Sequence, residues 1–254
     1  MLTVVLLCVM GFIAALVDSI AGGGGLISVP ALMMTNLPTH MVLGTNKFAS
    51  TTASFTSSLK FAKSGKVNFK LLKFLIPFTF IGSATGVYVL KFIPADFLKS
   101  IVLVLVLLIG VYSLKSKTLG MEDNSCDVIE KKTLIIGMIF AFCLGFYDGF
   151  FGPGTGSFLI FGFIKIFKFD FTKASGNAKM LNFTSNVSAL ILFAIQGNIN
   201  YLFGIPVAIF MILGARVGTK LAIDKGPKFI KPIFAVMSIA VFIKLIFPLI
   251  SSLF

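Results

Sequence analysis

The chain has 254 residues, of which 57% are hydrophobic and only 12% charged, about half the charged fraction of a typical soluble domain. This composition excludes a soluble globular protein and predicts an all-α polytopic membrane protein. The formal net charge of +13 does not indicate nucleic-acid binding, because the lysines lie in short loops between apolar segments. His40 is the only histidine, and Cys8, Cys126 and Cys143 lack metal or redox spacing, so no metal, cofactor or catalytic triad is expected.

Ten apolar segments follow one another along the chain. They are predicted near residues 2–17, 26–34, 46–62, 70–91, 98–114, 132–149, 156–168, 177–196, 200–222 and 229–250. The second and the seventh are too short to cross a bilayer, since a spanning helix needs about 20 residues. Each of these two short segments follows a glycine-rich turn, at Gly22–Gly25 and at Gly152–Gly156. The sequence therefore predicts spanning helices together with two half-length helices.

The same order of motifs occurs twice in the chain. Asp18, Gly22 and Gly24 recur 130 residues later as Asp148, Gly152 and Gly154. After a two-residue insertion the offset is 132. At this offset the recurring pairs are Gly44 and Gly176, Lys47 and Lys179, Gly65 and Gly197, Asn68 and Asn200, Gly82 and Gly214, and Gly86 and Gly218. A duplicated unit in an apolar chain is typical of transporters that bind their substrate between the halves. We expect one membrane domain over residues 1–254, with repeat 1 over about 1–114, a hinge loop over 115–131 and repeat 2 over 132–254.

Two topologies fit these segments. Either the first two segments of each repeat are halves of one broken spanning helix, which gives eight crossings, or each pair forms a re-entrant hairpin tipped by glycines. The hairpin model puts the lysine-rich loops after the third, fifth, seventh and ninth segments on one side, whereas the broken-helix model divides them between both sides. Basic loops stay cytoplasmic, so the lysines favour the hairpins. The two repeats of five segments are then inverted, and both termini lie outside a bacterial-type plasma membrane.

Polar side chains interrupt the third and eighth segments at helical spacing. Lys47, Ser50, Ser54 and Ser58 share one face of the third segment. Lys179, Asn182 and Asn186 of the eighth segment occupy the positions equivalent to the first three. A polar stripe of this kind faces a bundle interior or a wet cavity. A lysine ammonium inside a membrane needs a partner, which is either a substrate anion or the carboxylates of Asp18 and Asp148. The sequence leaves both partners open.

The two glycine turns are expected to meet near the membrane midplane. Free N–H groups at the start of each short helix favour an anion, and glycine lets a ligand approach the backbone closely. The predicted substrate-binding residues are Gly22, Gly23, Gly24, Gly25, Asn46, Lys47, Ser50, Gly152, Gly154, Gly156, Asn177, Lys179 and Asn182. The predicted coupling or gating residues are Asp18, Asp148 and Arg216. For the aspartates the alternative is a helix cap or salt bridge, and for the only arginine it is anion binding or pairing with an aspartate.

Five motifs resemble those of the TauE/SafE family of membrane transporters, often called sulfite exporters, and its YfcA-like branch most of all. They are VDSIAGGGGLISVPAL, GTNK, GFYDGFFGPGTGSF, AKMLNFTSNV and LGARVG. The resemblance covers nearly the whole chain. It implies a multi-pass plasma-membrane protein that moves small anions, especially sulfur oxyanions or organosulfonates such as sulfite, thiosulfate or sulfoacetate. The second repeat departs from the first in having Asn177 where Thr45 stands.

The leading hypothesis is a secondary transporter, without enzymatic activity, that works by alternating access around a midplane site between the repeats. Its expected partners are a small anion, the lipid bilayer and a coupling proton or cation, while nucleic acid is not expected and homo-oligomers stay open. A passive anion channel is one alternative. An intramembrane aspartyl protease is another, suggested by Tyr147-Asp148 and Pro30-Ala31-Leu32, but its Gly-x-Gly-Asp form is missing.

Overall fold

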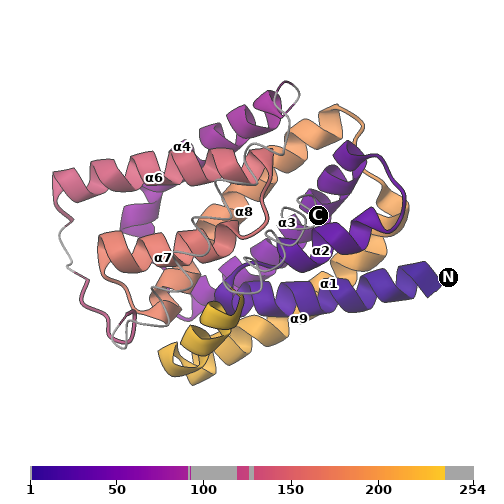
Figure 1. Ribbon diagram of the computed structural model, residues 1–254. Helices are drawn as coiled ribbons and strands as arrows, with labels where there is room; N and C mark the ends of the chain where they lie inside the picture. Colours follow the sequence, from indigo (N-terminus) through magenta and orange to yellow (C-terminus); the bar gives the residue numbers. More distant parts are fainter. Residues whose placement is uncertain (1, 91, 93–118, 126–128, 238–254) are drawn as a thin grey trace, which may run out of the picture.

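The computed structural model describes residues 2–90, 92, 119–125 and 129–237 (Figure 1). Its helices are α1 (Leu2–Ala21), α2 (Gly25–Met33), α3 (Thr39–Lys63), α4 (Phe69–Val89), α6 (Lys131–Phe150), α7 (Thr155–Phe167), α8 (Phe171–Ile195) and α9 (Tyr201–Lys225), and residues 227–237 are also helical. The described residues contain no strand, which confirms the all-helical prediction. The predicted segment 98–114 and most of 229–250 lie outside the described residues.

Five of the helices, α1, α4, α6, α8 and α9, are long and apolar enough to cross a membrane. The predicted short segments are confirmed, since α2 has 9 residues and α7 has 13. α3 has 25 residues but is less apolar, because the predicted polar stripe runs along it. These lengths fit a membrane protein that combines spanning and half-length helices.

The third and eighth helices begin earlier than predicted. α3 starts at Thr39, directly after Pro38, seven residues before the predicted start at 46, and α8 starts at Phe171, six residues before 177. The side chain of Asp170 caps α8 by accepting a hydrogen bond from the N–H of Lys173. Hydropathy alone placed both starts too late because polar residues and glycine interrupt these first turns, as THMVLGT in α3 and FTKASG in α8. Lys47 and Lys179 therefore lie inside their helices, two turns from the start.

The helices form two bundles, and each contains a helix from the opposite half of the chain. α1 packs along α9, and these two group with α2 and α3, whereas α4 packs along α6 and these two group with α7 and α8 (Figure 1). The buried apolar residues form two clusters, one around Phe163 and Phe171 and the other around Val42 and Val207, and each cluster takes residues from both bundles. The bundles meet mainly where α3 lies against α8. The polar stripes of α3 and α8 meet at this contact, where Lys47 and Ser54 hydrogen-bond with Asn186.

Glycines bring the paired helices into backbone contact, as the small-xxx-small spacing predicts. Gly82 and Gly86 of α4 lie against backbone carbonyls of α6, and Gly214 and Gly218 of α9 lie against backbone carbonyls of α1. A Cβ atom at any of the four positions would overlap a carbonyl oxygen. The α1–α9 and α4–α6 contacts therefore depend on glycine at equivalent positions of the two repeats.

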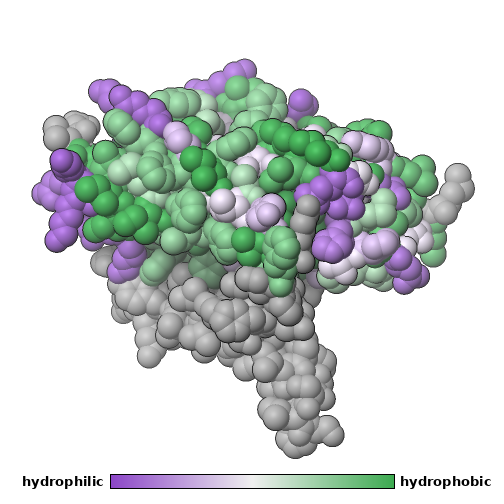
Figure 2. Space-filling model, turned by 90° about the horizontal axis from the view of Figure 1, so that it is seen from above, coloured by the Kyte–Doolittle hydropathy of each residue, from purple (hydrophilic) through white to green (hydrophobic). Residues whose placement is uncertain are grey.

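Much of the outer surface is apolar. Figure 2 shows broad hydrophobic areas, with hydrophilic residues at the left edge, along the top and in a group to the right of the centre. Large apolar side chains such as Leu2, Ile139, Ile195 and Leu202 are more than half exposed. Apolar surface of this extent is what a bilayer covers in a membrane protein.

Candidate functional site

The two glycine turns differ in the backbone conformations that they require. In the first turn, Gly22 and Gly23 have φ of 77° and 91°, and in the second, Gly152 and Gly154 have φ of 89° and 90°. Only glycine adopts these values readily. Gly24 has φ of −56°, so a side chain is excluded there by contact with Asp18 and the carbonyl of Ala14, not by backbone strain.

The turns lie against one another at the boundary between the bundles. Gly22 packs on the backbone of Gly156 and Ser157, and Gly25 packs on Pro153. The hydroxyl of Ser157 donates a hydrogen bond of 3.0 Å to the carbonyl of Ala21. The predicted meeting of the two turns is therefore present, and it places the first residues of α2 and α7 beside each other.

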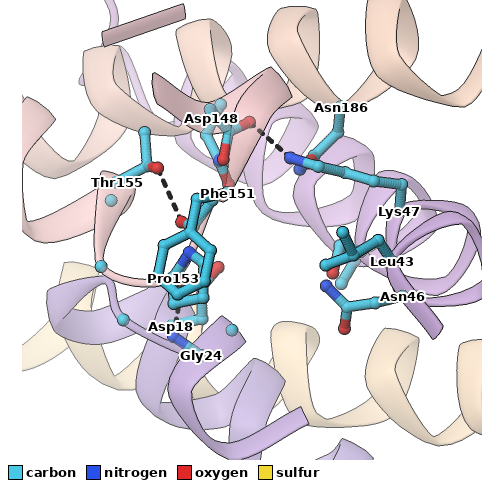
Figure 3. A pocket seen from close by; sticks show the side chains of 18 of the residues that line it. Asp18, Gly24, Leu43, Asn46, Lys47, Asp148, Phe151, Pro153, Thr155 and Asn186 are labelled. Atoms are coloured by element: carbon cyan, nitrogen blue, oxygen red, sulfur yellow. Dashed lines mark hydrogen bonds and ion pairs between the residues drawn. The ribbon is translucent and has the colours of Figure 1, made fainter. Parts of the chain in front are cut away.

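A cavity of about 40 Å³ opens beside the turns (Figure 3). It is lined by Asp18, Gly23, Gly24, Gly25, Leu43, Asn46, Lys47, Ser50, Ala53, Asp148, Phe151, Gly152, Pro153, Gly154, Thr155, Gly156, Asn182, Asn186 and Met211. Its volume takes about three water molecules. The lining combines both glycine turns with the polar faces of α3 and α8, so most of the predicted substrate-binding residues share one cavity.

Two ion pairs flank the cavity, and each joins the two repeats. The Lys47 ammonium lies 2.8 Å from Oδ2 of Asp148, and the Lys179 ammonium lies 2.5 Å from Oδ2 of Asp18. The two pairs occupy equivalent repeat positions. Of the two partners that the sequence left open for the lysines, this structure has the aspartates.

The two ion pairs have different surroundings. Lys47 also donates to Oδ1 of Asn186 at 3.0 Å, and Asp148 accepts a hydrogen bond of 2.5 Å from the hydroxyl of Ser185. Both Lys47 and Asp148 line the cavity, whereas Lys179 is fully buried and does not line it. Asp18 is held from the other side by the N–H of Gly24, which donates to its Oδ1 at 3.0 Å. Only one of the two ammonium groups therefore faces the space that a ligand would occupy.

Asn46 contributes an unsatisfied polar atom to the cavity. Its side-chain oxygen is buried and has no hydrogen-bond partner among the described residues. Figure 3 shows its amide on the α3 side, beside Leu43 and across from the glycine turns. A buried amide oxygen without a partner costs about 1–3 kcal/mol, so this position favours a water molecule or a ligand group that donates a hydrogen bond.

Four predicted site residues lie apart from the cavity lining. Gly22 packs against the backbone of Gly156 and Ser157, and Lys179 is paired with Asp18. Asn177 accepts a hydrogen bond of 2.9 Å from the N–H of Asn68 at the start of α4. Arg216 lies on the exposed side of α9, in a separate hollow. The structure gives Asn177 a structural contact, and it does not bring Arg216 to the ion pairs.

Several lining residues were missing from the predicted site. Asn186 follows Asn182 by one helical turn, so the polar stripe already carried its signal. Phe151, Leu43 and Met211 carry no such signal, because apolar side chains in an apolar chain do not reveal which cavity they face. Tyr147 holds the second turn by donating a hydrogen bond of 2.5 Å from its hydroxyl to the carbonyl of Pro153.

Asn177→Ala should lower stability without weakening substrate binding. The change removes the buried acceptor of the Asn68 N–H and the amide hydrogen bond of 2.7 Å to the carbonyl of Lys173. We expect a loss of about 1–3 kcal/mol, measured as a lower thermal unfolding midpoint in detergent. Asn182→Ala is the matched control, because it lies on the same helix but lines the cavity. A large fall in affinity for Asn177→Ala with unchanged stability would contradict the structural role.

The chain matches the family model described as "Sulfite exporter TauE/SafE" over residues 7–245. A probable membrane transporter protein of Haemophilus influenzae is 39% identical over 246 residues, which cover 97% of this chain and 95% of the relative. The probable membrane transporter protein YfcA of Escherichia coli K12 is 37% identical over 250 residues, covering 97% and 92%. YunE of Bacillus subtilis, also a probable membrane transporter protein, is 26% identical over 239 residues, covering 85% and 86%. No solved structure matches the chain. The chain belongs to the sulfite exporter TauE/SafE family and is a transmembrane transporter.

Proposed function

We propose that this protein is a secondary transporter of small anions, with sulfur oxyanions or organosulfonates as the substrate class. The observation that carries the proposal is the cavity in which Lys47 faces the starts of α2 and α7. Helix N-termini and an ammonium group both favour negative charge. Among the described residues, none accepts a hydrogen bond from the backbone N–H of Gly25 or of Gly156, so both donors are free for a ligand.

The size of the cavity favours a compact substrate. A space that takes about three water molecules holds an anion of about three or four non-hydrogen atoms, which is the size of sulfite. A longer organosulfonate such as sulfoacetate requires the cavity to open further. Sulfite-like anions are therefore the first substrates to test in this conformation.

Charge balance supports coupling to a proton. The two ion pairs contain two ammonium groups and two carboxylates, so the flanking charges sum to zero before an anion enters. Protonation of Asp148 would release Lys47 from its carboxylate partner and leave the cavity net positive. An anion and a proton would then enter together, and their departure would restore the Lys47–Asp148 pair.

Alternating access is proposed to run along the α3–α8 contact. The cavity lies at the boundary of the two bundles, and both ion pairs cross from one repeat to the other. The helix contacts follow the duplication, because α1 is equivalent to α6 and α9 is equivalent to α4. The α1–α9 contact of one bundle therefore corresponds to the α6–α4 contact of the other. The distribution of lysine-rich loops favours inverted repeats whose glycine-tipped hairpins enter from opposite faces, with both termini outside the plasma membrane.

Uptake by proteoliposomes tests the proposal directly. Sulfite, thiosulfate, sulfate, sulfoacetate and simple carboxylates should be compared with and without an inward proton gradient. We expect saturable uptake of at least one sulfur oxyanion, stimulated by the gradient and by unlabelled substrate on the opposite side. Fluxes that do not saturate and show no such exchange would identify a channel, and no flux of any of these anions would refute the substrate class.

A further inference from the structure

A second hollow, distinct from the central cavity, lies on the outer side of the α3–α9 contact. We refer to it as the cationic groove. It has a volume of about 360 Å³ and is lined by Phe55, Thr56, Leu59, Lys60, Lys63 and Arg216. Three of these six side chains are positively charged and two are apolar, which is an unusual combination on a helix surface that faces lipid.

No carboxylate among the described residues neutralises the charges of the cationic groove. Lys60 donates a hydrogen bond of 3.0 Å to the backbone carbonyl of Arg216, which joins the last turn of α3 to the interior of α9. No ion pair joins Lys60, Lys63 or Arg216 to a carboxylate in the part of the chain that the structure describes. The groove therefore attracts an anion from its surroundings.

The depth of Arg216 indicates where that anion comes from. Arg216 lies nine residues before the end of α9 at Lys225, which is about 13 Å along the helix axis. Phe55 and Leu59 form the apolar wall of the groove and are 51% and 45% exposed. A guanidinium beside exposed apolar side chains on a spanning helix meets lipid headgroups when it extends toward the membrane surface.

The other repeat provides a natural comparison. At the offset of 132 residues, Lys60, Lys63 and Arg216 correspond to Leu192, Ile195 and Ala84. The equivalent surface is therefore uncharged, and Ile195 is 78% exposed there. The duplicated fold does not need cations at these positions, so the three charges serve a purpose on one face of the membrane only.

We propose that the cationic groove binds the phosphate headgroup of an anionic phospholipid, with an acyl chain lying against Phe55 and Leu59. The three cations hold the phosphate, and the apolar wall distinguishes a lipid from a free phosphate ion. Basic pockets between spanning helices on the cytoplasmic side bind such lipids, and the lysine-rich loop after α3 places this groove on that side. The proposal rests on membership of a membrane transporter family and is independent of the transported substrate.

Thermal stability of the purified full-length protein tests the lipid site. The protein is titrated in neutral detergent with short-chain phosphatidylglycerol, with phosphatidylcholine of the same chain length, and with inorganic phosphate. The test variant is Lys63→Gln/Arg216→Gln, which leaves the Lys60 hydrogen bond in place. Its matched control is Lys70→Gln/Lys73→Gln, which removes the same charge at exposed positions outside the groove.

We expect phosphatidylglycerol alone to raise the unfolding midpoint of the wild type and of the control. The apparent affinity of the test variant should fall by about fivefold for each cation removed, or about 25-fold in total. Native mass spectrometry should show one retained phosphatidylglycerol on the wild type and a reduced signal for the test variant. Equal stabilisation of test and control variants would overturn the groove as the site. Stabilisation by inorganic phosphate at the same concentration would overturn the lipid as the ligand, and so would the absence of any shift.

Discussion

Lys47→Gln is expected to weaken anion binding by about ten- to a hundredfold and to destabilise the folded protein by about 3–5 kcal/mol. The affinity loss is that of a charge-assisted hydrogen bond worth about 1.5–3 kcal/mol. The stability loss follows because Asp148, which is 2% exposed, would keep a buried charge without its ammonium partner at 2.8 Å. Affinity is measured by substrate binding to purified protein, and stability by thermal unfolding.

The double variant Lys47→Gln/Asp148→Asn separates two roles of this lysine. If Lys47 binds the anion, the double variant regains stability but not affinity. If Lys47 only neutralises Asp148, the double variant regains both. The equivalent pair is an internal control, because Lys179 is fully buried and does not line the cavity. Lys179→Gln/Asp18→Asn should therefore retain most of the affinity, and an equal loss in both double variants would refute the asymmetry between the pairs.

Gly22→Ala is expected to abolish transport and to reduce the yield of folded protein. The residue has φ of 77°, which costs a residue with a Cβ about 1–2 kcal/mol, and its new methyl group would overlap the backbone of Gly156 and Ser157. The two turns would have to separate, which would displace the starts of α2 and α7 from the cavity. Uptake assays together with size-exclusion profiles of the solubilised protein measure the effect.

Gly65→Ala is the matched control for the turn. Gly65 has a similar φ of 71°, but a Cβ atom there would have nothing within 4 Å. It should cost about 1–2 kcal/mol and leave transport intact. Similar losses of transport in both variants would mean that backbone conformation alone, and not the contact between the turns, accounts for the requirement for glycine at position 22.

Periodicity and duplication predicted most of the helices and many of the residues that line the central cavity. The two short helices followed from segment length, and the meeting of Gly22 with Gly156 followed the expectation that duplicated turns face each other. The Lys47–Asp148 pair was one of two alternatives, because a buried ammonium requires an anion of some kind. These features are recoverable from sequence since they depend on residue type and spacing.

The positions of Asn177, Arg216 and Lys179 depended on packing that the sequence does not encode locally. Asn177 is equivalent to Thr45, and both accept a backbone N–H at the start of a neighbouring helix, at Asn68 and at Asn200. This shared contact explains why a threonine and an asparagine replace each other in the two repeats. The duplication makes Lys47 and Lys179 equivalent in sequence, so it does not indicate which of them faces the cavity. That difference depends on the orientation of the two side chains.

The exchange of α4 and α9 between the bundles also bears on how such a chain could arise. A single repeat on its own would lack the helix that covers its α1 or α6 glycine contact, because that helix belongs to the other repeat. A half-length ancestor would gain this contact in a dimer in which each copy supplied one helix to the other. Gene fusion would have made that exchange intramolecular and allowed the two copies to diverge in sequence. Lys60, Lys63 and Arg216, which have uncharged equivalents in the other repeat, are an example of such divergence.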